Sequence, residues 1–367
     1  MEARVINPRS VLFRFSLPWD VPDGRRDMRN RFLFLTAIVI TVLAASCGDR
    51  DENATQSIAV FVPGVLEGSP TYEMMDQGVR ASAEKAAIEV KTVEGGFDQA
   101  SWENQLMVLA SEGRYGLIVT SNPAMSEIAV RAAESYPDQE FLVLDGSGLT
   151  GDGVSDLVYD HREQAFLIGY FAALVTESED LEGANEQLKV GMIIGQEYPQ
   201  MNREILPGYE IGMHTVNPDI EMEVRILGNW YDAEKARELA SGLYQDGVDV
   251  ILTIAGGANQ GVIAAAKENG TYVLWFDSDG TGFAPGTVLA SAVIHQDKAA
   301  AEAVERWING DMEMGQSNRL GIIEGYVDFP MDGKDFRKHV PESIADQMAE
   351  VLERMKSGNL SLRTLDG

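Results

Sequence analysis

Short apolar runs rich in β-branched residues alternate with longer segments of helical periodicity from residue 57 onward, and this alternation limits the possible folds most strongly. The first run covers residues 58–62, and helical periodicity follows at 71–88. Apolar strands that alternate with amphipathic helices predict parallel sheets with helices on both faces. Ligand sites of such sheets lie at the carboxyl ends of the strands. We therefore expect an α/β protein whose site residues directly follow its strands.

The alternation occurs in two series, which are separated by a segment rich in glycine and aspartate at 146–153. A chain of this length is too long for one typical core, so we expect two doubly wound parallel-sheet domains with facing strand ends, joined by a multi-strand hinge. The strand at 288–294 and the helices after it are expected to return to the first domain and cross again. We assign residues 57–155 plus 290–315 to the N-terminal domain, and 156–289 plus 316–358 to the C-terminal domain. The strands expected in the two series are 58–62, 117–119 and 141–144, then 190–194, 221–227, 248–254 and 272–276.

The N-terminal segment has the pattern of an export signal. Arg29 and Arg31 precede an apolar run at 32–45, and small residues close that run. A basic flank, a short apolar core and a small-residue exit are typical of a secretory signal peptide. The run is short for a membrane-spanning helix, which needs about 20 apolar residues. We predict a signal at 28–46 with translation starting at Met28, so that residues 1–27 are an untranslated extension.

Cys47 is the single cysteine of the chain and directly follows that signal. The sequence LAASC at 43–47 resembles the bacterial lipobox, in which the cysteine carries a lipid. An incidental thiol in an uncleaved anchor helix is the alternative. We predict a lipid on Cys47, a polar tether at 47–56, and a protein held on the cell membrane that faces the periplasm or the extracellular side.

The charge balance excludes some partners. The chain has 29 basic and 58 acidic residues and a formal net charge of −29. A nucleic-acid backbone would repel such a surface, and anionic ligands would need a local basic pocket. Acidity of this kind usually serves solubility. We expect no nucleic-acid partner.

Motifs that carry catalysis are missing from the sequence. There is no P-loop, no Gly-x-Gly-x-x-Gly after the first strand and no Gly-x-Ser-x-Gly elbow. The residues 62–64 that end the first strand do not supply the aspartate cluster of a nucleoside hydrolase. The histidines lack metal-ligand spacing, so we expect no metal, no cofactor and no enzymatic activity. These histidines are His161, His214, His295 and His339.

Five segments together resemble the basic membrane lipoprotein family, whose best-known members are purine-nucleoside-binding lipoproteins of ABC importers. The resemblance covers residues 58–358 and implies the type I periplasmic-binding-protein fold. It also implies capture of a small molecule, delivery to an ABC permease, and a monomer. The segments are EQAFLIGY at 163–170, GNWYD at 228–232, GVDVI at 247–251, AGGANQGV at 255–262 and VLWFD at 273–277.

The resemblance and the strand-end rule together give the candidate ligand-binding residues. Trp230 follows a strand at the position where the family has an aromatic ring that stacks on the base, and Tyr72 lies near the second stacking ring. Asp277 matches a carboxylate that accepts hydrogen bonds from ribose or base. Gly256 permits close approach of the backbone at a helix start. Lesser candidates at or near strand ends are Asn122, Asp145 and Asn259.

The first loop departs from the family pattern. The expected aspartate is replaced near Pro63, and the Ser-Phe-Asn triplet reads Pro-Thr-Tyr at 70–72. The family's lysine after the strand near Ser291 is replaced by Ile294 or His295. A non-nucleoside solute is therefore an alternative ligand, and a sensory ligand-binding lipoprotein is an alternative role because the same fold serves both. A nucleoside-processing enzyme is the least favoured alternative.

Overall fold

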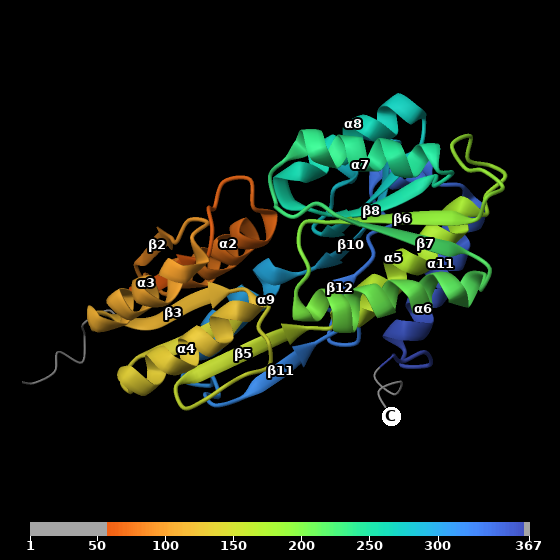
Figure 1. Cartoon of the computed structure of the whole chain (residues 1–367). Helices are drawn as coiled ribbons and strands as arrows, with labels where there is room; N and C mark the ends of the chain where they lie inside the picture. The colour runs from red at the N-terminus through yellow and green to blue at the C-terminus, as the bar shows by residue number, and fades with distance from the viewer. Residues whose placement is uncertain (1–56, 363–367) are drawn as a thin grey trace, which may run out of the picture. The chain divides into compact units, whose positions relative to one another are not determined.

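The computed structural model describes residues 57–362 (Figure 1). The described residues belong to one compact unit that contains two six-stranded sheets. The expected signal peptide, Cys47 and the tether lie outside the described residues. The chain is therefore an α/β protein with two sheets, as the alternation of strands and helices predicts.

The first sheet is parallel throughout and has the strand order β11-β5-β4-β3-β1-β2. Its side chains alternate between two faces, because successive residues of a strand point in opposite directions. Ile58 and Val60 pack toward α2 (Pro70–Lys85) and α9 (Gln296–Ile308). Ala59 and Phe61 pack toward α3 (Gln99–Ser111) and α4 (Pro123–Ser135). The strands are β1 (Ser57–Val62), β2 (Val90–Glu94), β3 (Tyr115–Ser121), β4 (Glu140–Leu144), β5 (Val154–Tyr159) and β11 (Ser317–Leu320).

The second sheet has the order β12-β10-β9-β8-β6-β7 and is parallel except for β12, which runs antiparallel to β10. One face packs on α5 (His161–Thr176), α6 (Leu206–Val216) and α11 (Glu342–Lys356). The other packs on α7 (Ala233–Gln245) and α8 (Asn259–Asn269). Both sheets thus carry helices on both faces. The strands are β6 (Lys189–Ile194), β7 (Glu221–Ile226), β8 (Val250–Ile254), β9 (Tyr272–Asp277), β10 (Val288–Ile294) and β12 (Val327–Asp328).

The chain crosses between the sheets three times, from β5 to α5, from β10 to α9 and from β11 to β12. These crossings differ from the expected domain boundaries. Residues 156–159 belong to β5 of the first sheet, and 290–294 belong to β10, which pairs with β9 of the second sheet. The chain returns to the first domain only with α9, which packs on α2. A fully buried apolar strand has the same sequence pattern in either sheet, so the sequence does not predict where the chain passes from one sheet to the other.

Some local features also differ from the pattern in the sequence. The alternation did not reveal β2, α3 or β5, which the structure adds to the first series. Pro207 lies in the first turn of α6, where a missing N–H costs nothing, after a short π-helical turn at Met201–Ile205.

Bilayer-spanning helices were sought among residues 57–362, and none of the helices there combines sufficient length with sufficient apolar character.

Candidate functional site

Three candidate residues end strands in a left-handed backbone conformation. Asn122 follows β3, Asp145 follows β4, and Asp277 ends β9, with φ angles of 110°, 50° and 68°. Such conformations cost a non-glycine residue about 1–3 kcal/mol each and concentrate at functional sites. All three therefore occupy the strand-end positions where a parallel sheet places its ligand contacts.

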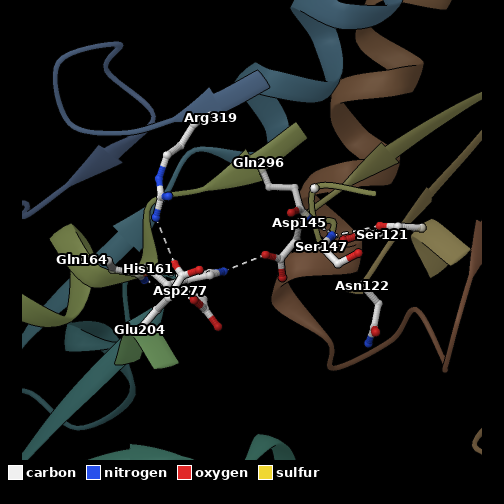
Figure 2. A network of polar contacts seen from close by, with 12 residues as sticks. Ser121, Asn122, Asp145, Ser147, His161, Gln164, Glu204, Asp277, Gln296 and Arg319 are labelled. Atoms are coloured by element: carbon white, nitrogen blue, oxygen red, sulfur yellow. Dashed lines mark hydrogen bonds and ion pairs between the residues drawn. The ribbon is translucent and has the colours of Figure 1, made fainter. Parts of the chain in front are cut away.

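His161 joins the two aspartates (Figure 2). Its Nε2 lies 2.7 Å from Asp145 Oδ1, and its Nδ1 lies 2.9 Å from Gln164 Oε1. The Gln164 amide donates to Asp277 Oδ1 at 3.1 Å and to the Ala292 carbonyl at 3.0 Å. Asp145 belongs to the first sheet, whereas Asp277 belongs to the second. The first turn of α5 therefore connects the site carboxylates of both sheets.

Charges in this cluster are strongly coupled. Burial disfavours the His161 imidazolium, but Asp145, Asp277 and the contact with Gln164 outweigh it and raise the pKa of His161 to about 10. Burial raises the pKa of Asp277 to about 6, and the positive charge of His161 opposes that rise. At neutral pH His161 is a cation between two carboxylates. His161 therefore offsets one of the two negative charges of Asp145 and Asp277.

The start of α5 is fixed by contacts to β11. Asp160 caps the helix by accepting a hydrogen bond from the Glu163 amide. Arg319 on β11 donates to Asp160 at 2.9 Å and to Glu204 at 3.2 Å (Figure 2). A cation at a helix N-terminus such as His161 opposes the helix dipole, and surrounding carboxylates offset this cost. These contacts hold His161 in place where the chain crosses between the sheets.

Tyr72 and Asn122 lie together at the first sheet. The Asn122 amide is 3.5 Å from the Tyr72 hydroxyl, which donates to the Pro63 carbonyl at 3.3 Å. Burial, with a smaller contribution from the charge of Asp145, raises the pKa of Tyr72 to about 12. The structure therefore groups Tyr72, which lies in the first turn of α2 and not in a loop, with Asn122 and Asp145, which follow β3 and β4.

Trp230 lies at the end of the second sheet against two glycines. A Cβ on Gly195 would meet the Trp230 ring at 2.5 Å, and one on Gly256 would meet the Trp230 carbonyl at 2.9 Å. The indole N–H donates to the Gln196 side chain at 3.1 Å. Tyr198 packs 6.3 Å from the indole, centroid to centroid. The Trp230 ring is half-buried and held in one orientation by these neighbours.

Tyr198 connects the aromatic and the acidic parts of the site. Burial raises the pKa of its hydroxyl, and the charges of Asp277 and Asp145 add to that rise. Those charges act on Tyr198 only because both carboxylates are near it. Tyr198 therefore packs on the Trp230 indole, and the charges of both carboxylates act on its hydroxyl.

Asn259 has a local structural contact. Its side-chain oxygen accepts from the Thr253 hydroxyl at 2.7 Å and from the Ala255 amide at 2.8 Å. Both partners belong to the β8 end that leads to Gly256, whose φ is 58°. The Asn259 oxygen therefore fixes the turn that carries Gly256.

Reasoning from the sequence did not select His161, Gln164, Gln196 or Tyr198. His161 was weighed only as a metal ligand, and its spacing excluded that role. It lies two residues after the end of β5, a strand that the sequence pattern did not reveal, so the strand-end rule did not reach it. Gln164 and Tyr198 lie within a helix and a loop, and nothing in their local pattern points inward.

The site offers hydrogen-bond acceptors and aromatic rings. Within the described part of the chain, no group of three or more histidine, cysteine, aspartate or glutamate side chains is arranged to hold a metal ion. Carboxylates, amides and rings of this kind suit recognition of a polar aromatic solute.

Comparison with known proteins gives a family model and many related structures. The model described as ABC transporter substrate-binding protein, PnrA-like, matches residues 55–361. Basic membrane protein D of Borreliella burgdorferi (strain JD1) is 25% identical over 303 residues, which cover 81% of this chain and 84% of the relative. A solute-binding protein of an ABC transporter system from Aeropyrum pernix K1 has a TM-score of 0.72 at 21% identity, over 83% of this chain and 92% of its own.

Another solute-binding protein, from Conexibacter woesei, has a TM-score of 0.61 at 20% identity and covers 84% of this chain and 98% of its own. These structures confirm the expected type I periplasmic-binding-protein fold. The family model and these two neighbours are described as solute-binding proteins of ABC transporters.

Proposed function

The chain belongs to the PnrA-like family of ABC transporter substrate-binding proteins, and from this premise we propose that it captures a purine nucleoside or a similar solute outside the cytoplasm and delivers it to an ABC permease. In this proposal, a lipid on Cys47 anchors the protein to the membrane. The ligand lies between the two sheets, at the strand ends that carry Asp145 and Asp277. The proposal includes no catalytic step.

The joining of these two carboxylates through His161 is the observation that carries the proposal. Each carboxylate has an oxygen for which the structure gives no hydrogen bond, since His161 and Gln164 contact only the Oδ1 atoms. Ribose hydroxyls and base N–H groups are donors that such oxygens accept. His161 offsets one of the two negative charges of this pair, and the hydroxyl and N–H donors of a neutral polyol or nucleoside would suit the remaining acceptor oxygens.

The aromatic residues support a planar ligand. Trp230 lies in the loop after β7 of the second sheet, and Tyr72 lies in the first turn of α2, the helix that follows β1 of the first sheet. Stacking of a base on an aromatic ring contributes about 1–3 kcal/mol. A base between such rings and a ribose on the carboxylates would use both halves of the site. Hinge bending at the three crossings would then enclose the ligand.

The test is a thermal-shift screen of purified residues 57–367 against nucleosides, nucleobases, sugars and amino acids. Binding to the native state raises the melting temperature by mass action. We expect the largest shift with a purine nucleoside, a loss of that shift in Trp230→Ala, and its retention in Trp307→Ala. Trp307 is a matched control because its indole contacts Glu140 of the first sheet at 2.6 Å, away from the strand ends of the second.

Shifts with sugars or amino acids alone would overturn the nucleoside assignment and leave the solute-binding role. If none of the four classes raises the melting temperature, and nucleoside is consumed when it is incubated with the protein, the result would point to an enzyme and overturn the transport role.

A further inference from the structure

Phe97 and Tyr231 occupy equivalent places in the two sheets. Phe97 lies in the loop between β2 and α3, and Tyr231 lies in the loop between β7 and α7. Strands β2 and β7 are the corresponding edge strands, next to β1 and β6. Each aromatic residue directly precedes the aspartate that caps the next helix, which is Asp98 or Asp232. The same turn thus carries an aromatic side chain in both halves of the molecule.

These two side chains are the most exposed large apolar groups of residues 57–362. Phe97 is 75% exposed and Tyr231 78%, and the next most exposed, Val108, is 54%. Apolar surface exposed in this way has a free-energy cost in water, which binding of a partner would recover. Aromatic residues are also enriched among the side chains that dominate protein interfaces.

Both loops are held rigidly. In the first, the amides of Gly95 and Gly96 donate to the carbonyls of Val62 and Gly64 at 2.7 and 2.8 Å. In the second, the amides of Leu227 and Gly228 donate to Ile194 and Gly195, both at 2.8 Å. The Asn229 side chain also accepts from the amides of Tyr231 and Asp232. The aromatic side chains therefore stand on an ordered backbone, which lowers the entropic cost of binding.

Acidic groups flank each aromatic residue. Glu94 and Asp98 lie around Phe97, and Asp232 and Glu234 lie around Tyr231. Lys235 follows Tyr231, and its amine donates to the Leu227 carbonyl at 2.7 Å. A partner would therefore need basic groups around an apolar contact, and an anionic lipid surface would be repelled.

We propose that Phe97 and Tyr231 are paired docking anchors that insert into two equivalent recesses of the ABC permease, each with an apolar floor and a basic rim. This inference rests on the proposed transport function and names the surface that performs delivery. Because the anchors belong to different sheets, their separation changes when the hinge bends. Simultaneous insertion of both therefore reports the hinge state to the permease.

The test uses the lipidated full chain and the permease encoded beside its gene, reconstituted in nanodiscs with its ATPase subunits. ATPase stimulation is measured against protein concentration, with and without inosine. We expect Phe97→Ala and Tyr231→Ala each to raise the half-maximal concentration about tenfold, since burial of such a ring is lost. The double variant raises the half-maximal concentration more than either single variant does. Val108→Ala and Phe283→Ala, which truncate exposed side chains outside both loops, leave the concentration unchanged.

The outcomes separate the two proposals. Stimulation by the native protein that is unchanged in the double variant overturns the docking surface and leaves the transport role. Absence of stimulation by the native protein overturns both. Equal loss in the Val108 or Phe283 control overturns the assignment to these loops. If the native protein binds permease-free nanodiscs and the double variant does not, the anchors bind lipid, and the proposal is overturned. If the native protein self-associates in sedimentation and the double variant does not, the anchors bind a second copy of this chain, and the proposal is also overturned.

Discussion

Replacing His161 with glutamine should lower the free energy of unfolding by about 3–5 kcal/mol at pH 7, because it leaves a carboxylate pair without its cation. The His161 side chain is 7% exposed and lies 2.7 Å from Asp145. A pKa raised from 6.5 to about 10 corresponds to about 5 kcal/mol in favour of the imidazolium, at about 1.4 kcal/mol for each pKa unit. Because glutamine can still form some of these hydrogen bonds, the expected loss of unfolding free energy is at most about 5 kcal/mol.

The pH dependence distinguishes this charge effect from a loss of packing. Between the unfolded pKa of 6.5 and the folded pKa of about 10, the folded state holds a proton that the unfolded state has released. The stabilisation is therefore complete below pH 6.5 and is lost as the pH rises through about 10. The native protein should lose about 1.4 kcal/mol of stability per pH unit from this group, and the variant should not. The difference in unfolding free energy between the native protein and the variant therefore becomes smaller as the pH rises.

Urea unfolding of both proteins at several pH values between about 6.5 and 9.5 measures this difference. His214→Gln is the matched control, because the His214 ring contacts the backbone carbonyl of Ile220 at 3.2 Å instead of a carboxylate. A stability difference between native protein and His161→Gln that stays constant with pH would refute the imidazolium assignment.

Three further outcomes are expected. Ligand affinity should fall by up to about tenfold per pH unit as the pH drops below about 6, where Asp277 becomes protonated and loses an acceptor, as titration calorimetry at constant ionic strength would show. Trp230→Ala should weaken ligand binding by about 1–3 kcal/mol in the same assay with little change in the unliganded melting temperature. Gly169→Ala should destabilise the protein by about 2–3 kcal/mol in urea unfolding because its Cβ would lie 2.2 Å from the Tyr209 carbonyl, whereas Gly242→Ala, which has open space in α7, should stabilise it by about 0.4–1 kcal/mol.

The sequence predicted the architecture because its strongest signal is local. Buried parallel strands such as β8 read as continuous apolar runs, and the helices between them have amphipathic periodicity. Edge strand β2, with the sequence VKTVE, is polar and partly exposed and has no such signal. The crossing points were also missed, because they depend on which sheet a strand pairs with, which is a long-range contact.

The same distinction applies to the site. Asp145 and Asp277 could be selected because a polar residue at the end of an apolar strand is a local pattern with a known meaning. His161 became visible only when the fold brought it within 2.7 Å of Asp145, a residue 16 positions away along the chain. Gln164 contacts Asp277 across 113 positions. Contacts over such separations leave no periodic trace in one sequence.

The equivalence of the two sheets explains which parts of the site are shared and which are specific. Strands β4 and β9 hold the same place in their sheets, and both lead to an aspartate in a left-handed conformation. Strands β3 and β8 also correspond, and left-handed residues, Asn122 and Gly256, follow them. The backbone of the site is therefore built twice from one plan. Strands β5 and β10 correspond as well, and each leads to a helix that crosses between the sheets. The first residues of these two helices differ in chemistry, because α5 begins with His161 and α9 begins with Gln296. A ligand that contacts both aspartates meets similar carboxylates on two sides, so the unsymmetrical residues around them, Trp230 above all, must distinguish one solute from another.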